Sequence, residues 1–432
     1  MKLLKSIILK IIYGITISIV YLRYLLTKWE RKTVGLVLEE FFHQDLRGFG
    51  GYAMTAKNIS DYYNLHPQQN LQINILLATK LPIAPKPCVK KYHHAKVLFR
   101  PVNDDNPNID LIRYLWSFAK NPSQVLLTIE YYETYHYVLK ALFWIPVIIY
   151  IRDPRGEEEW QRLGAISSEL KWRKKDSVES LIKAMDRENS FVRDMIELSK
   201  KNNRKVIFAS NADFLAERAK KAYHLPGMKP YFLPNPLVMP QLENIVPTLK
   251  PSIIFIGRLD PQKRIWMIFE LAKRFKDIDF LIGGTTSASE GNVLAPVIDE
   301  YKHLSNLKFL GLIDGPRKWK ALEESWGMIN TSIHEGLPVT FLESLCMAKP
   351  IISCLNPDEL VSRFGYYTGD ILGEGMDEDS LNKFVKQIEL FLSDPKIRHE
   401  KGRLGREYVE KRHTFENFDK HLREMLKNEK IF

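Results

Sequence analysis

Two cations in the string GRLDPQK, residues 257–263, are spaced so that they could bind one anion. The string follows an apolar run that predicts a buried strand, so Arg258 and Lys263 belong to the loop at its carboxyl end. Arg258 can offer a fork of two donors, and Lys263 can offer a compact positive charge to the same group. A diphosphate would satisfy both side chains. The alternative is a turn that carries two solvated cations.

Two glutamates eight positions apart belong to the most specific stretch, HEGLPVTFLE, residues 334–343. Glu335 lies in a loop after a predicted strand, and Glu343 lies on the first turns of the helix that follows. Amides at the start of a helix bind phosphate, and carboxylates on either side of them can bind hydroxyl groups. This combination matches a nucleotide sugar. The alternative is a capping acid followed by a surface glutamate.

Two glycines, Gly50 and Gly51, end the string RGFGG after the first predicted strand. A helix is predicted from about Tyr52, so main-chain amides would face whatever occupies the loop. Glycine lets a phosphate approach the main chain closely, which makes the loop a candidate anion site. A tight turn is the alternative, since the string is not GxGxxG.

The elements that must position these residues follow an α/β pattern, because short apolar runs alternate with helical stretches from residue 33 onward. Two facing, doubly wound Rossmann-like domains are expected, with ligands beyond the carboxyl ends of the strands. The predicted strands are 33–38, 72–77, 96–99, 125–130, 146–151, 206–209, 230–233, 252–257, 279–283, 307–310, 327–331 and 350–354. The predicted helices are 52–64, 108–119, 132–143, 165–200, 212–222, 264–275, 292–304, 316–324, 340–347, 378–393, 396–411 and 415–428.

A length of 432 residues also favours two cores over one. Residues 33–234 are expected to form the first domain, and residues 251–395 the second. A proline-rich hinge, 235–250, would join them. Residues 396–432 would form closing helices that could pack back across the domains, and residues 1–32 a separate amino-terminal helix.

This amino-terminal helix is strongly apolar, but Lys10 and Arg23 interrupt it and leave only about twelve uninterrupted apolar residues, short of the roughly twenty that span a bilayer. Two arrangements fit this segment about equally: an amphipathic helix in the headgroup plane of an anionic membrane, or a single membrane anchor. A cleaved signal peptide and a plain soluble helix are the minor alternatives. On a helical projection one sector holds Lys2, Lys5, Ser6, Lys10, Thr16, Arg23, Thr27 and Lys28. The opposite face holds Leu4, Ile7, Ile8, Ile11, Ile15, Ile19, Leu22, Leu25 and Leu26.

The charge distribution agrees with an anionic partner for the first half of the chain. The net charge is +11, with +13 on residues 1–250 and −2 on residues 251–432. A membrane surface or a nucleic acid could supply that partner. The three cysteines are odd in number and form no CxxC pair, which fits a reducing compartment and disfavours a disulfide framework or a cysteine zinc site.

Taken together, these motifs resemble the retaining glycosyltransferases of family 4, the "glycosyl transferases group 1" set with the GT-B fold, over most of residues 33–370. The resemblance rests on the Gly-Gly loop, FASNADFLAERAKKAYHL before FLPNPL, GRLDPQK, FLIGGT and HEGLPVTFLESLCMAKPII. It implies transfer of a sugar from a nucleoside diphosphate to an acceptor hydroxyl with retention at the anomeric carbon. No cofactor or metal is expected, and the D-x-D string at Asp277 and Asp279 stands at the wrong end of its predicted strand for a ligand site.

The resemblance also implies roles for individual residues. Arg258 and Lys263 would hold the donor diphosphate, Glu343 the ribose hydroxyls and Glu335 the transferred sugar. The remaining phosphate and sugar contacts would come from Gly50, Gly51, Gly336, Leu337, Pro338, Val339 and Thr340. No metal ligand is assigned.

One departure from the family concerns a His-Asp pair at the end of a central first-domain strand. The matching stretch here, VIIYIRDPR, places Arg152 and Asp153 there. Arg152 is expected either to act electrostatically at the reacting carbon, to serve an unusual sugar, or to mark lost activity. The alternative without a catalytic role is an ion pair between the two residues at the rim of the site. His334 is interpreted as a structural or rim residue because it lacks partners at metal-ligand spacing.

The favoured hypothesis is a glycosyltransferase at the cytoplasmic face of a membrane, acting on a glycan or a lipid-linked acceptor. The alternative is an inactive relative that binds nucleotide sugars as a membrane-associated partner protein. Nucleic-acid binding rests only on the basic pI of about 9.2 and on no recognised module, so no nucleic-acid partner is expected.

Overall fold

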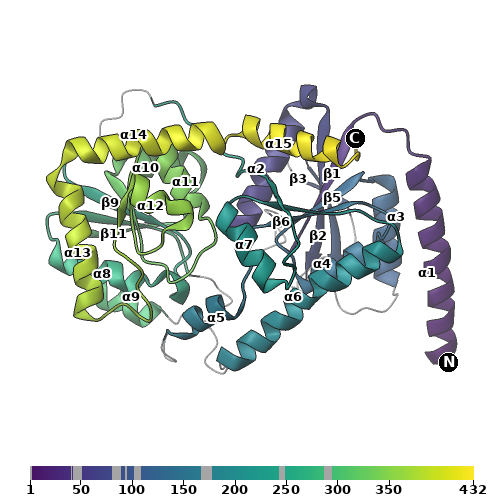
Figure 1. Cartoon of the computed structure of the whole chain (residues 1–432), viewed down its shortest axis with the longest axis horizontal. Helices are drawn as coiled ribbons and strands as arrows, with labels where there is room; N and C mark the ends of the chain where they lie inside the picture. Colours follow the sequence, from purple (N-terminus) through teal and green to yellow (C-terminus); the bar gives the residue numbers. More distant parts are fainter. Residues whose placement is uncertain are drawn as a thin grey trace.

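The computed structural model describes residues 2–39, 41, 51–79, 89–92, 95–101, 109–166, 178–242, 249–286 and 294–432. Figure 1 shows two lobes, each built on one sheet with helices on both faces, and a long helix at the outer edge of the first lobe. The α/β class and the two facing parallel-sheet domains are confirmed.

The first sheet has eight strands in the order β3-β4-β2-β1-β5-β6-β7-β8. All neighbouring strands are parallel except β3 and β4, which pair antiparallel. The strands are β1 (Lys32–Leu38), β2 (Leu71–Thr79), β3 (Val89–Tyr92), β4 (Ala95–Pro101), β5 (Val125–Ile129), β6 (Val147–Ile151), β7 (Val206–Ser210) and β8 (Tyr231–Phe232). Its helices are α2 (Gly51–Leu65), α3 (Ile109–Lys120), α4 (Glu133–Ala141), α5 (Glu157–Gly164), α6 (Val178–Lys201) and α7 (Asp213–Ala222).

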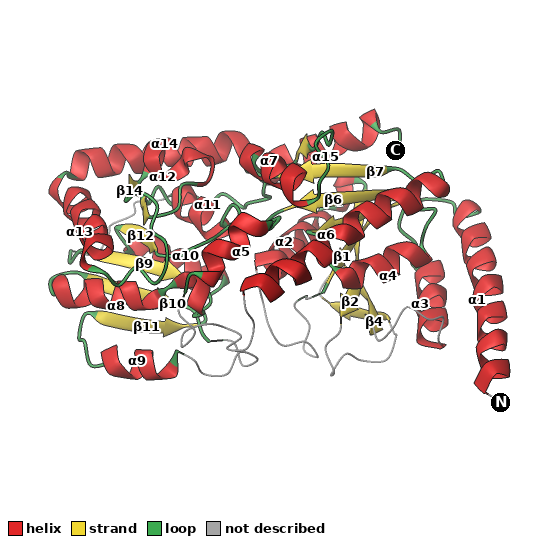
Figure 2. Ribbon diagram, turned by 60° about the horizontal axis from the view of Figure 1, so that its bottom comes forward, coloured by secondary structure: helices red, strands yellow, loops and turns green. Residues whose placement is uncertain are grey.

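The second sheet has six strands, all parallel, in the order β11-β10-β9-β12-β13-β14. The strands are β9 (Ser252–Ile256), β10 (Asp279–Gly283), β11 (Leu307–Gly311), β12 (Gly327–Asn330), β13 (Ile351–Ser353) and β14 (Tyr366–Tyr367). Its helices are α8 (Ile265–Arg274), α9 (Ala295–Tyr301), α10 (Gly315–Glu324), α11 (Val339–Cys346), α12 (Leu360–Phe364) and α13 (Glu378–Ser393). Figure 2 shows these strands as a layer between helices.

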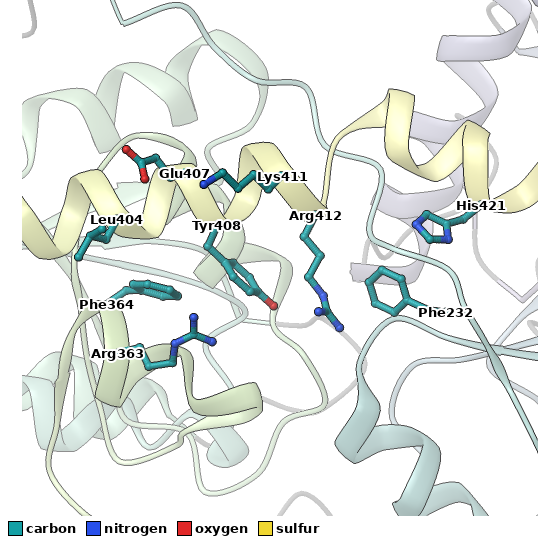
Figure 3. A pocket seen from close by; sticks show the side chains of 9 residues that line it. All are labelled: Phe232, Arg363, Phe364, Leu404, Glu407, Tyr408, Lys411, Arg412 and His421. Atoms are coloured by element: carbon teal, nitrogen blue, oxygen red, sulfur yellow. The ribbon is translucent and has the colours of Figure 1, made fainter.

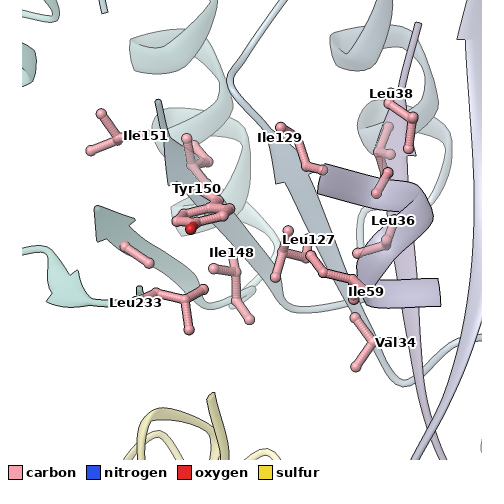
Figure 4. Packing of buried hydrophobic residues seen from close by; sticks show 14 of the residues in the cluster. Val34, Leu36, Leu38, Ile59, Leu127, Ile129, Ile148, Tyr150, Ile151 and Leu233 are labelled. Carbon is pink, nitrogen blue, oxygen red and sulfur yellow. The ribbon is translucent and has the colours of Figure 1, made fainter. Parts of the chain in front are cut away.

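The central strands consist mainly of apolar residues because helices cover both faces of the sheet. All five residues of β5 and of β6 are buried, which is typical of a covered parallel sheet. Figure 4 shows the packing between these strands, β1 and α2, where Leu36, Ile59, Leu127 and Ile148 meet. At about 25 cal/mol per Å² of apolar surface, this burial is the main force that holds the lobe together.

Two carboxyl-terminal helices join the lobes. Helix α14 (Pro395–Arg412) packs on α11 and α12 of the second lobe. Helix α15 (Phe415–Asn428) crosses to the first lobe, where Phe415 stacks on Tyr62 at 4.3 Å between ring centroids. Side-chain oxygens cap the amino ends of both helices. The Asp394 side chain accepts a hydrogen bond from the backbone N–H of Ile397, and the Thr414 side chain accepts one from the backbone N–H of Asn417.

Some elements differ from those expected. The helix predicted for 165–200 is confirmed as α6 from Val178 onward, but Ala165 and Ile166 are not helical, and residues 167–177 lie outside the described residues. Strands β3 and β14 and helices α5 and α12 were not predicted. Each has eight residues or fewer, so its hydrophobic periodicity is too short to identify.

Helix α1 (Lys2–Leu25) lies beside α3, as Figure 1 shows. The expected apolar face is exposed along its length. The prediction that Thr16 lies in a solvent-facing polar sector is wrong. Thr16, near the middle of the helix, is only 3% exposed and lies on the face that meets the first lobe.

Candidate functional site

The candidate loops lie at the topological switch point of each sheet, where the order in which successive strands are added reverses. In the second sheet this point lies between β9 and β12, whose carboxyl ends lead into residues 257–264 and 331–338. In the first sheet it lies between β1 and β5, with β6 next to β5. Ligands bind outside such switch points in open α/β sheets.

Glu130, the residue after β5, fixes the loop after β6. It is 5% exposed and has a left-handed backbone, with φ of 62°. Its Oε2 accepts the backbone N–H groups of Arg152 at 2.9 Å and Asp153 at 2.5 Å, and its Oε1 accepts the hydroxyl of Tyr223 at 2.6 Å. Burial raises the pKa of Glu130, an effect that these donors oppose. Glu130 is not among the predicted site residues, although an acid directly after the apolar run VLLTI was a usable signal.

Asp153 stands at the centre of a cluster of cations. Arg155 donates to its Oδ2 from Nε at 2.9 Å and from Nη2 at 2.7 Å. Arg218 lies 3.4 Å from its Oδ1. Burial alone would raise the pKa of Asp153, but Arg155, then His334 and Arg218, lower it well below its ordinary value. Asp153 is therefore ionised at neutral pH.

His334, from the second lobe, reaches the same carboxylate. Its Nε2 donates to Oδ1 of Asp153 at 2.8 Å, and its side chain is 3% exposed. Burial lowers the pKa of His334, while the charge of Asp153 opposes that shift. The imidazole is therefore neutral at pH 7 and carries its hydrogen on Nε2. Of the two interpretations given for His334, the rim residue is wrong because the side chain is buried, whereas a structural role agrees with its contact across the lobes.

Lys263 and Glu335 form an ion pair next to this contact. The Nζ of Lys263 contacts Oε1 of Glu335, which also accepts the hydroxyl of Ser332 at 2.8 Å. Both side chains of the ion pair are mostly buried, at 16% and 13% exposed. Arg218 donates to the backbone oxygen of Glu335 at 3.3 Å. The structure thus brings Lys263, Glu335 and Asp153 into one cluster between the lobes.

Arg264 holds the Lys263 loop against its neighbours. It is fully buried and has φ of 46°. Its guanidinium donates to the backbone oxygens of Thr331 at 2.7 Å and Ile371 at 3.0 Å. Further donors reach Gly373 and Ser332. Because these oxygens come from several loops, Arg264 fixes the position of Lys263 relative to Glu335.

Two glycines are required by close main-chain contacts. A Cβ on Gly336 would lie 2.1 Å from the backbone oxygen of Arg152, in the other lobe. A Cβ on Gly284, in the FLIGGT string, would lie 1.8 Å from the oxygen of Gly257. A side chain at Gly336 would therefore push the lobes apart, and one at Gly284 would separate the loops after β9 and β10.

Other predicted residues lie around this cluster. Arg258 is at the rim, with 49% of its side chain exposed and its Nε 3.5 Å from Asp260. Glu343, on α11, is buried and forms an ion pair with Lys318 at 2.5 Å. Leu337 is buried, Pro338 precedes α11, and Val339 and Thr340 form its first turn.

The Gly-Gly loop is described only from Gly51, which begins α2. Gly50 lies outside the described residues. Tyr52, next to Gly51, is close enough to Tyr132, Glu130 and Asp153 for their charges to raise its pKa further after burial. The start of α2 therefore faces the same cluster.

Arg152 is directed elsewhere. Its guanidinium lies over the ring of Tyr150, 5.1 Å from the centroid, and its Nη1 donates to the hydroxyl of Tyr150 at 3.3 Å. The side chain is 4% exposed. It therefore packs beneath the loop that carries Asp153, and the two residues form no rim ion pair.

A hollow of about 660 Å³ lies at a different place, along α14 between the lobes (Figure 3). It contains none of the predicted site residues. The hollow is formed by α14 together with side chains of β8, α12 and α15. It is lined by Phe232, Arg363, Phe364, Leu404, Glu407, Tyr408, Lys411, Arg412 and His421.

Asp279 of the D-x-D string begins β10 and pairs with Lys250 at 2.5 Å and with Lys308. It therefore lies at the amino end of its strand, opposite the candidate loops. Within the described ranges, no three His, Cys, Asp or Glu side chains are grouped so that they could hold a metal ion.

Comparison with known proteins now identifies the second lobe. Residues 243–408 match the family model described as glycosyl transferases group 1. The second lobe is a group 1 glycosyltransferase domain. The match includes the loops of Lys263, His334 and Glu335, so the cluster above lies on the glycosyltransferase domain and the lobe that faces it. No curated protein matches the sequence.

Solved glycosyltransferase structures share the fold of the whole chain. Sucrose-phosphate synthase from Thermosynechococcus elongatus superposes with a TM-score of 0.66 at 14% identity, covering 92% of this chain and 99% of that one. HepE from Anabaena, in complex with UDP and glucose, gives 0.61 at 12% identity, covering 91% and 99%. WaaG, a glycosyltransferase involved in lipopolysaccharide biosynthesis, gives 0.57 at 11% identity, covering 90% and 98%. The chain therefore has the GT-B fold.

Proposed function

We propose that this glycosyltransferase transfers a sugar from a nucleoside-diphosphate sugar to an acceptor hydroxyl with retention at the anomeric carbon, as the resemblance to family 4 implies. The observation that carries the proposal is the contact of Lys263 with Glu335, next to Asp153 at the junction of the lobes. A cation for the leaving diphosphate and a carboxylate for the sugar are thereby adjacent. HepE, which shares the fold, holds UDP and glucose.

In this proposal the donor lies between the loops after β9 and β12. Lys263 and Arg258 bind the diphosphate, together with Gly51 and Gly50 from the facing lobe and the amides from Gly336 to Thr340. The leaving diphosphate gains negative charge as the glycosidic bond breaks, so fixed cations and amides lower the barrier. Glu343 binds the ribose after exchanging its contact with Lys318. This arrangement needs no metal.

Asp153 and Glu335 are the proposed catalytic carboxylates. Arg155 and Arg218 keep Asp153 ionised beside the sugar, where negative charge stabilises positive charge that develops at the anomeric carbon. Lys263 contacts both Glu335 and the proposed diphosphate, so it couples sugar position to leaving-group position. His334 completes this geometry only when the lobes are closed.

The acceptor is proposed to be a glycan or a membrane-held lipid, in glycan, glycolipid or cell-surface polysaccharide synthesis, with the catalytic lobes on the cytoplasmic side. The support is α1, in which Ser6–Leu25 has a mean hydropathy of 1.6 and is long enough to cross a membrane. An anionic membrane surface is the proposed partner of residues 1–32.

The orientation of Arg152 supports a second candidate, an inactive relative that binds nucleotide sugars without turnover. Its guanidinium packs on Tyr150, so Arg152, which stands where the family has its histidine, does not direct its side chain toward the Asp153 cluster. Transfer and hydrolysis assays with UDP- and GDP-sugars separate the candidates. A thermal-shift screen with UDP, GDP and ADP identifies the nucleotide, because a ligand of the folded state raises the Tm. Binding without transfer or hydrolysis of any donor would favour the inactive relative.

A further inference from the structure

Helix α1 exposes a continuous apolar face. At about 100° per residue, its exposed large apolar side chains, Tyr21 apart, fall within a sector of about 140°. Their exposure ranges from 42% at Ile12 to 72% at Leu26. The face extends over about 35 Å at 1.5 Å per residue. It consists of Leu4, Ile7, Ile8, Ile11, Ile12, Ile15, Ile19, Leu22, Leu25 and Leu26.

The opposite side of α1 is docked on the first lobe. Val20 is fully buried in its core, Thr16 is 3% exposed, and Tyr13 and Ile17 pack against the same core. Near the end of the helix, Tyr24 donates its hydroxyl to the backbone oxygen of Gln124 at 3.3 Å. The docked strip therefore extends from Tyr13 to Tyr24.

This docking is incompatible with a membrane span. Only residues 6–12 of the apolar segment precede the docked strip, and they cover about 10 Å at 1.5 Å per residue. A bilayer core is about 30 Å thick. To span it, α1 would have to leave the lobe and expose the apolar surface that Val20, Ile17 and Tyr24 now cover.

Charged side chains border the apolar face on both sides. On the helical projection Lys10 lies beyond one margin and Arg23 beyond the other, and both are exposed. Lys28 and Arg31, also exposed, follow the helix. Cations at the margins of an apolar face match the headgroups of an anionic bilayer, which lie just above its acyl region.

An aromatic cluster lies where α1 meets the lobe. The ring of Tyr21, which is 40% exposed, is 5.2 Å from that of Trp144, and Tyr24 is 5.6 Å from Trp29. Tyr and Trp favour the membrane interface, where one part of the ring is apolar and the other is wet.

We propose that α1 binds the surface of an anionic bilayer while it stays docked on the first lobe, so that it lies in the membrane plane and fixes the orientation of the enzyme. Its apolar face enters the headgroup and acyl boundary, and Lys10, Arg23 and Lys28 contact lipid phosphates. This selects the in-plane arrangement over a single membrane anchor. It deepens the proposed membrane attachment and does not depend on the chemistry of transfer.

The first test is flotation of the full chain with vesicles of phosphatidylglycerol and phosphatidylcholine in equal parts, and with phosphatidylcholine alone. We expect strong flotation with the anionic vesicles and at least tenfold weaker binding to the neutral ones, because several cations contribute about 1 kcal/mol each. The triple variant Ile11→Glu, Ile15→Glu, Leu22→Glu should lose flotation with an unchanged Tm. The matched control is Leu372→Glu, Leu390→Glu, Ile397→Glu, which changes similarly exposed residues on the second lobe and should float normally. Equal flotation of both triple variants would overturn the proposal.

The second test distinguishes lying in the plane from spanning. In a Cys88→Ser background, Ser6→Cys stands on the water-facing side of α1 and Ile8→Cys on its apolar face, while Cys346 and Cys354 are buried. With vesicles present, an impermeant maleimide should label position 6 and spare position 8, and both should react without vesicles. Protection of both positions would show a span and overturn the proposal.

Two further measurements distinguish membrane binding from dimerisation through the apolar face, and a failure of this proposal from a failure of the proposed reaction. The proposal requires the chain to be monomeric without lipid; a dimer that the glutamate triple variant abolishes would assign the apolar face to a second copy instead. Glu335→Gln should float as the parent does, and the glutamate triple variant should retain activity on a soluble acceptor. Loss of transfer with normal flotation would therefore count against the proposed reaction alone.

Discussion

The imidazole of His334 joins the two lobes through Asp153. Its Nε2 lies 2.8 Å from Oδ1 of Asp153, although the residues are 181 positions apart. Around this contact, Arg155 and Arg218 hold Asp153 and Lys263 holds Glu335. Because its members come from both lobes, the cluster is complete only in the closed arrangement.

Replacing His334 tests whether this contact supports turnover. We expect His334→Ala to lower kcat at least roughly tenfold, since small misplacements at a reacting centre can cost about 100-fold. His334→Gln, which keeps a donor, should recover part of the loss. His303→Ala, at an exposed histidine of the same lobe, is the control. Normal kcat in His334→Ala would make the contact structural.

Substitutions of Asp153 and Arg152 should affect different measurements, kcat for Asp153 and Tm for Arg152. We expect Asp153→Asn to lower kcat about 100-fold or more, because an electrostatic group beside the sugar is lost. Arg152→Ala should mainly lower the Tm, since its guanidinium packs on Tyr150 away from Glu335. Steady-state kinetics and thermal unfolding of both variants distinguish the catalytic role of Asp153 from the structural role of Arg152. A large kcat loss with normal Tm in Arg152→Ala would return Arg152 to the catalytic site.

Closure itself depends on Gly336. A methyl group there would lie 2.1 Å from the oxygen of Arg152, so we expect Gly336→Ala to lower kcat strongly while nucleotide affinity changes only a few-fold. Gly227→Ala is a matched control, because nothing lies within 4 Å of its added Cβ. Small-angle scattering should detect a more open Gly336→Ala protein. An unchanged scattering profile together with normal kcat would contradict this role.

Nucleotide affinity should depend on the two loop cations. We expect Lys263→Ala to weaken UDP binding at least tenfold, because a charge-assisted contact contributes about 1.5–3 kcal/mol. Arg258→Ala should have a smaller effect, since its side chain is half exposed. Calorimetric titration with UDP measures both, with the exposed Lys302→Ala as the control. If charge reversal at both loop cations left UDP affinity unchanged, the donor site would lie elsewhere.

His413 should make stability depend on pH. Burial, and then the charges of Arg412 and Arg152, lower its pKa to about 3. The unfolded chain, with a pKa near 6.5, binds the proton more readily, so stability is lost as pH falls below about 6.5. Between pH 7 and 5 this loss is about 2 kcal/mol. His413→Gln should remove that part of the slope in urea unfolding. Groups retained in both proteins, such as His334 and Glu130, cancel in the comparison, so an unchanged slope would refute the assignment.

Local pattern predicted much of the fold. The buried runs of β5 and β6 were recognised because parallel strands covered on both faces need continuous apolar sequence. The loops with Lys263 and Glu335 were found because motifs at strand ends are local. The exposed apolar face of α1 was also found, since helical periodicity depends only on neighbouring residues.

The tertiary structure decided which of these local features meet. Periodicity places Thr16 on a face of α1 but cannot say that this face docks on the lobe. Similarly, the string VIIYIRDPR identifies Arg152 and Asp153 but not that one turns to Tyr150 and the other to His334. Glu130 acquires its role only because β5 and β6 are neighbours in the sheet. Sequence determines such local preferences, whereas contacts across 181 positions depend on how whole sheets and lobes pack.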